Sequence, residues 1–152
     1  MRADWTILVA ACILPASVCP LQAQGRAAAS VRSTLAGVYT EAQAARGRDT
    51  FAGMCQACHT PATHTGPVFL SHWGGRPLWD LFDFVRQNMP QSDPGSLSLA
   101  EYAQVMAYVL KLNGMPPGAR ELPVTPAGLR AIRFDTAPAP PTKGMRPWSD
   151  ER

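Results

Sequence analysis

The segment Cys55-Gln56-Ala57-Cys58-His59 combines two thiols and an imidazole at a spacing that suits metal or redox chemistry. In the pattern C-x-x-C-H, the two cysteines can form thioethers with the vinyl groups of haem, and the histidine can bind the haem iron. The same residue types also occur as a thiol–disulfide redox pair and as half of a zinc site. The motif alone does not decide between haem attachment, a thiol–disulfide pair and a zinc site, so the rest of the sequence is needed.

The N-terminus bears on this choice because it predicts how many cysteines the mature protein keeps. Residues 1–23 join a charged start to a short apolar stretch and a small-residue exit, which is typical of a cleaved export signal. The apolar stretch is too short to span a bilayer, so no stable membrane span is expected after cleavage. Cleavage removes Cys12 and Cys19 and leaves Cys55 and Cys58, with no second pair to complete a four-thiolate zinc site. Export to the periplasm favours haem attachment.

The residues before the C-x-x-C-H predict the helix that positions it. Thr40 and Gln43 fit a capping box, in which the Thr40 side chain caps the helix and the Gln43 side chain reaches back. Gly47, Phe51 and Cys55 then recur at helical spacing and form an apolar stripe that runs into the motif. Because glycine weakens a helix, its presence on this stripe indicates that another backbone passes close by.

Two further helices are predicted downstream. Residues 60–75 contain prolines, glycines and threonines and are expected to form a loop. A helix over 77–88 follows, with proline in its first turn and a second proline just beyond its end. Ser98 and Glu101 form a second capping box, which predicts a helix over 98–112 that ends at an Asn-Gly pair.

Composition and charge narrow the choice of partners. The net charge is +3 over 152 residues and the basic residues form no run, so a nucleic-acid partner is not expected. The 15 prolines gather toward the C-terminus, and residues 119–152 are expected to form a proline-rich extension with a short helical turn over 127–132. This extension either docks the protein on a larger subunit or is a solvated terminus.

A haem iron bound by His59 needs a second axial ligand, which in low-spin cytochromes is usually methionine or histidine. Met89 is the preferred candidate because it follows a predicted helix, precedes Pro90 and lies in a turn-rich loop. His72, beside Trp73, is the strongest alternative. The remaining candidates downstream of the motif are Met106, Met115, Met145 and His64.

Several motifs occur in an order that matches a known family. Gly47 and Phe51 precede the C-x-x-C-H, and Gly66-Pro67, Met89-Pro90 and Ala107-Tyr108-Val109-Leu110 follow it. With these motifs, residues 37–118 resemble the small class I c-type cytochromes. The resemblance implies an all-α fold in which three or more helices surround one covalent haem c, after an N-terminal lead over 24–36. The first and last helices would cross, with Gly47 and Phe51 against Tyr108.

The resemblance also implies roles for individual residues. Cys55 and Cys58 would form the two thioethers, and His59 and Met89 would be the axial ligands of the iron. Pro67 would direct its carbonyl toward the ring N–H of His59. Such a bond to the non-ligating nitrogen fixes the imidazole and tunes its basicity.

A second set of motifs consists of Met89-Pro90, Pro94-Gly95-Ser96-Leu97-Ser98, Glu101-Tyr102, Ala107-Tyr108 and Asn113-Gly114. It resembles cytochromes that serve periplasmic dehydrogenases, the quinoprotein alcohol dehydrogenases included. This resemblance implies an electron carrier that is reduced by a dehydrogenase and oxidised by a downstream cytochrome or terminal oxidase. Two alternatives remain, namely a haem enzyme or gas sensor with an exchangeable distal ligand, and a haem-free thiol–disulfide protein.

Overall fold

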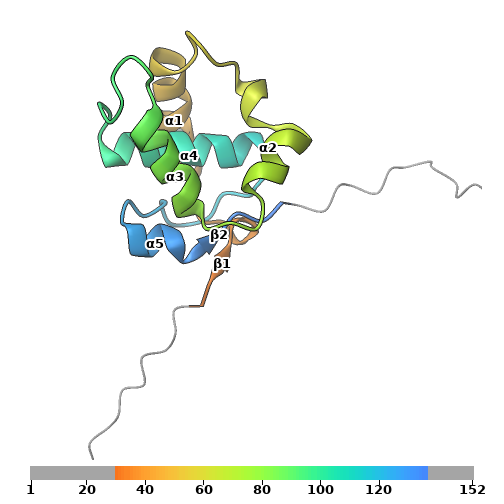
Figure 1. Cartoon of the computed structure of the whole chain (residues 1–152). Coiled ribbons are helices and arrows are strands. Elements are labelled where there is room, and N and C mark those ends of the chain that lie inside the picture. Colours follow the sequence, from red (N-terminus) through yellow and green to blue (C-terminus); the bar gives the residue numbers. More distant parts are fainter. Residues whose placement is uncertain (1–29, 137–152) are drawn as a thin grey trace, which may run out of the picture.

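The structure is a computed structural model, and it describes residues 30–136 (Figure 1). The predicted export signal, Met145 and the tail from residue 137 onward lie outside the described residues. In the part that the structure describes, none of the helices combines the length and the apolar character needed to cross a membrane.

The described part of the chain is helical, as predicted, with one minimal parallel sheet in which β1 pairs with β2. Figure 1 shows α1 crossing α4, with α5 and the two strands together on one side of the molecule. In chain order the elements are β1 (Arg32–Ser33), the 3₁₀ helix η1 (Thr34–Ala36), α1 (Glu41–Met54), the 3₁₀ helix η2 (Pro61–His64), α2 (Gly66–Trp73), α3 (Leu78–Asn88), α4 (Leu99–Leu112), α5 (Pro126–Arg130) and β2 (Ile132–Arg133).

The crossing of α1 and α4 is close because a glycine lies at the contact. A Cβ atom at Gly47 would lie 1.8 Å from the carbonyl oxygen of Gln104 on α4, so no larger residue fits without moving a backbone. One turn further along α1, the rings of Phe51 and Tyr108 contact each other with their centroids 5.6 Å apart. The predicted crossing of these two helices is therefore confirmed, and it fixes the direction in which α1 ends.

We expect Gly47→Ala to lower the free energy of unfolding by about 1–3 kcal/mol, because the added methyl group forces α1 away from α4. Gly53→Ala in the same helix is the matched control, since a Cβ there meets nothing within 4 Å. This control variant should gain about 0.5–1 kcal/mol from the better helix propensity of alanine. Denaturant unfolding of both variants measures the difference, and equal effects would show that the crossing is not close.

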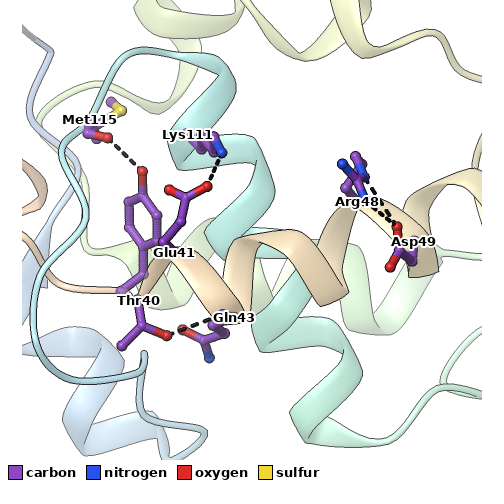
Figure 2. A network of polar contacts seen from close by, with 8 residues as sticks. Thr40, Glu41, Gln43, Arg48, Asp49, Lys111 and Met115 are labelled. Carbon is purple, nitrogen blue, oxygen red and sulfur yellow. Dashed lines mark hydrogen bonds and ion pairs between the residues drawn. The ribbon is translucent and has the colours of Figure 1, made fainter.

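The N-terminus of α1 is capped as predicted, but its glutamine has another role. The Thr40 hydroxyl accepts a hydrogen bond from the Gln43 backbone N–H at 3.1 Å (Figure 2). The prediction that the Gln43 side chain reaches back to the cap is wrong. The side chain is buried, and its oxygen accepts a hydrogen bond from the Leu122 N–H at 2.8 Å. Its amide nitrogen donates to the Leu122 carbonyl at 3.5 Å, so one side chain satisfies both backbone groups of a buried residue.

We expect Gln43→Met to cost about 1–3 kcal/mol of stability, because it leaves the buried Leu122 N–H and carbonyl without partners. Gln87→Met is a suitable control, since the exposed Gln87 side chain binds only Asp83 on the surface of α3. That control should change stability by less than about 0.5 kcal/mol. The two melting temperatures measure the difference, and a Gln43 variant as stable as the control would show that the bonds to Leu122 contribute nothing.

The segment 60–75 differs from the prediction. It was expected to be a loop, whereas the structure contains η2 and α2 within it. Gly66 and Pro67 form the first turn of α2, where proline is well tolerated because the first helical N–H groups have no intrahelical partner. Apolar residues follow, and Trp73 at the end of α2 is buried. The two residues that suggested a break in the chain therefore begin a helix.

The other helices agree with the sequence. α3 begins at Leu78, so Pro77 is its N-cap and not part of its first turn as predicted, and it ends at Asn88, as the proline after Met89 predicted. Ser98 and Glu101 form the predicted capping box of α4. Gly114 has a φ of 75°, which is the left-handed conformation expected after the last turn of a helix.

The chain after α4 packs onto the helices and does not leave the domain at residue 118. Four residues beyond 118 are buried in the same core as α1 and α4, namely Leu122, Leu129, Ile132 and Phe134. α5 confirms the predicted helical turn, although it begins one residue earlier and ends at Arg130, and Ile132 belongs to β2. This part of the chain also contacts the N-terminal segment, because the buried Thr34 hydroxyl in η1 donates to the Asp135 carbonyl at 2.8 Å.

Polar contacts connect the start of α1 to the segment after α4. The Tyr39 hydroxyl donates to the Met115 carbonyl at 2.6 Å, and both residues are buried. Glu41 forms an ion pair with Lys111 at the end of α4 (Figure 2). Since Glu41 and Lys111 are exposed, their ion pair adds little stability, and the buried tyrosine bond is the more important contact.

Candidate functional site

A single cavity brings together the C-x-x-C-H motif and Met89. Its volume is about 860 Å³, within the range of small-molecule and cofactor sites. Cys55, Cys58, His59 and Met89 all line it. Most of the other lining side chains are apolar, and they are Phe51, Met54, Ala57, Phe69, Trp73, Leu81, Phe84, Val85, Pro90, Val105, Met106 and Val109.

A compact turn after α1 carries the three residues of the motif. The Cys55 N–H donates to the Phe51 carbonyl at 2.9 Å, so the cysteine continues the last turn of the helix. The Cys55 carbonyl then accepts bonds from the N–H groups of Cys58, at 3.1 Å, and His59, at 2.9 Å. This turn places both thiols and the imidazole along one wall of the cavity.

In the part of the chain that the structure describes, the two cysteines of the motif form no disulfide, and Cys58 is exposed while Cys55 is partly buried. Burial raises the pKa of the Cys55 thiol. Cysteines that act in thiol–disulfide exchange usually have a lowered pKa, because the thiolate is the reactive species. The environment of Cys55 therefore disfavours the reading of this motif as a thiol–disulfide pair.

Met89 reaches the cavity from a separate element. It is the C-cap of α3 and has an extended backbone, and its N–H donates to the Val85 carbonyl at 2.8 Å. The Tyr102 hydroxyl on α4 donates to the Met89 carbonyl at 2.6 Å. The same hydroxyl accepts a bond from the Gly95 N–H at 3.1 Å. Two points of the loop that follows α3 are thus attached to one buried tyrosine, which fixes the backbone of Met89.

The structure separates the other candidates for a second axial ligand. Met106 lines the cavity, but it is buried within α4 among core side chains. Met115 lies in the core and His72 is exposed on α2, and neither lines this cavity. The His72 ring contacts the edge of Trp73, with the centroids 4.7 Å apart.

Pro67 and His64 occupy unexpected positions. Pro67 is exposed in the first turn of α2 and is not one of the residues that line the cavity, so its bond to His59 stays a prediction. His64, which the sequence suggested only as one of several candidate ligands, lines the cavity beside His59. Burial lowers the pKa of the His64 imidazole, a hydrogen bond that the ring donates to the Thr60 backbone raises it, and coulombic repulsion from His59 lowers it further.

The chemistry of this donor set fits one cofactor. Two thiols, an imidazole and a thioether converge on an apolar cavity, as haem c requires for its thioether bonds and its axial positions. Residues 42–109 match the family model described as "Cytochrome C oxidase, cbb3-type, subunit III". The segment is a class I c-type cytochrome domain. Searches of curated proteins and of solved structures gave no match.

The cytochrome domain carries covalently bound haem c and transfers electrons by means of it. The domain itself is an electron carrier and not a catalyst. Domains of this kind are typically exported. The helical structure agrees with the small all-α fold that the sequence predicted.

Proposed function

We propose that the protein is a periplasmic one-electron carrier in which His59 and Met89 are the axial ligands of the haem iron. Cys55 and Cys58 form the two thioether bonds. The observation that carries this proposal is that the end of α1 and the end of α3 contribute these four residues to the same cavity.

The residues around the cavity support electron transfer in a specific way. Bound haem c supplies the ferric–ferrous couple. His59 and Met89 come from turns attached to helices, so their positions need not change between the two oxidation states. The apolar side chains exclude water, and the soft thioether of Met89 favours ferrous iron and so raises the reduction potential.

We further propose that the electron donor is a periplasmic dehydrogenase, in line with the motifs that resemble the cytochromes of quinoprotein dehydrogenases. The acceptor is a downstream cytochrome or a terminal oxidase. The exposed side chains of Met54 and Phe84 line the cavity, so the site is accessible to a partner from that side. Purifying the native protein together with its partner, and reducing it with that partner's substrate, tests this assignment. A partner with no redox cofactor would contradict it.

The covalent attachment can be tested directly. We expect a haem stain on a denaturing gel to colour the exported protein, because thioether bonds survive denaturation. The pyridine haemochrome spectrum should correspond to two thioethers in the wild type and to one in Cys55→Ser or Cys58→Ser. Extracts of the periplasm should contain the stained band. An exported protein without stain would instead favour the haem-free thiol–disulfide alternative.

A further inference from the structure

We propose that His64 is a positioning residue that fixes the orientation of the His59 imidazole. The inference rests on the proposed function, in which His59 is an axial ligand. The two rings lie with their centroids 5.0 Å apart and their planes at 76°, so the edge of one ring faces the other. A side chain in this position restricts the rotation of its neighbour about the bond that joins it to a metal.

His64 can act in this way because its own ring is held on several sides. It makes edge contacts with Phe51 on α1, at 5.5 Å between centroids, and with Phe69 on α2, at 6.0 Å. Its Nδ1 atom lies 2.9 Å from the Thr63 hydroxyl oxygen. Because two aromatic rings and a hydroxyl group surround it, the His64 ring is a rigid neighbour for His59.

The backbone at His64 is also attached to the core. The Asn113 side chain at the end of α4 donates to the His64 carbonyl at 2.8 Å and to the Val109 carbonyl at the same distance. This amide connects η2 to α4, which in turn is packed against α1. His64 therefore has a fixed position relative to α1, the helix that precedes the turn with His59.

The ring contact restrains His59 independently of the bond predicted from the Pro67 carbonyl. Groups around a metal ligand orient it and tune the metal. Pro67 is exposed, whereas His64 contacts His59 inside the cavity. Because the contact depends on a flat ring at position 64, a phenylalanine should replace it and an aliphatic side chain should not.

The proton NMR spectrum of the ferric holoprotein tests this inference, because the spread of the haem methyl shifts depends on the orientation of the axial imidazole. We expect His64→Ala and His64→Leu to lose the wild-type pattern of shifts, and His64→Phe to retain it. His72→Ala is the matched control, since this histidine is exposed and lies outside the cavity. It should leave the pattern unchanged.

The outcomes distinguish a failure of this inference from a failure of the proposed function. A wild-type pattern in His64→Leu would overturn the role of His64 while leaving the His59–Met89 assignment intact. Loss of low-spin ligation in all three His64 variants would contradict both the positioning role and the His59–Met89 assignment, because His64 would then be a ligand. A wild-type protein without His–Met ligation would instead contradict the proposed function. If His64→Ala fails to fold, the leucine and phenylalanine variants still decide the question.

Discussion

Replacing Met89 with alanine is expected to lower the reduction potential by on the order of 0.1 V and to open the sixth coordination position of the iron. The thioether stabilises ferrous iron, and no other thioether lies in the loop between α3 and α4. A redox titration followed by absorption measures the potential. The rate at which the reduced protein binds carbon monoxide measures whether the sixth position is open. Wild-type protein with both ligands in place should bind it slowly or not at all.

Met106→Leu is the matched control for this prediction. Met106 lines the same cavity from α4 and is buried, and leucine keeps its volume and apolar character. We expect this variant to keep the wild-type potential and the closed sixth position. An unchanged potential in Met89→Ala would mean that another residue binds the iron. Rapid uptake of carbon monoxide by the wild type would favour the gas sensor or haem enzyme.

The double variant Cys55→Ser/Cys58→Ser is expected to lose covalent haem and, with it, cooperative unfolding. The cavity of about 860 Å³ is lined mainly by apolar side chains from α1, α3 and α4. Without the bound group, the apolar side chains that line the cavity face water at a cost of about 25 cal/mol per Å² of apolar surface, which is a large loss for a domain whose net stability is typically about 5–15 kcal/mol. The helices should therefore collapse or separate.

Circular dichroism and thermal melting of the exported double variant measure this loss. The corresponding control is Cys12→Ser/Cys19→Ser, whose positions lie in the predicted export signal. This control should still carry two thioether bonds and melt as the wild type does. A double variant of Cys55 and Cys58 that melts cooperatively near the wild-type temperature would show that the fold does not depend on the bound group.

Local signals in the sequence were sufficient for the helices that deliver the main residues. The Thr40 cap and the capping box at Ser98 depend on neighbours within one turn, so the sequence predicts them directly. The loop after α3 was predictable for the same reason, because Pro90 prevents the helix from continuing past Met89. A glycine on the apolar stripe of a helix indicates a close approach by another backbone, although not which one, and at Gly47 that backbone is Gln104 of α4.

Contacts between distant segments could not be predicted in this way. The Gln43 side chain binds the backbone of Leu122, 79 residues away, and nothing near Gln43 indicates this. The position of His64 depends on η2 and α2, which glycine and proline made to look like a loop. The short spacing between His59 and His64 was the one signal that could have placed them together.

The central claim is that Met89 and His59 bind one haem iron, and the proton NMR spectrum of the ferrous protein tests it most directly. An axial methionine lies over the face of the macrocycle, whose ring current shifts its methyl protons far upfield. We predict one such three-proton signal in the wild type and in Met106→Leu, and its loss in Met89→Leu. The absence of this signal from the wild type, or its persistence in Met89→Leu, would contradict the assignment.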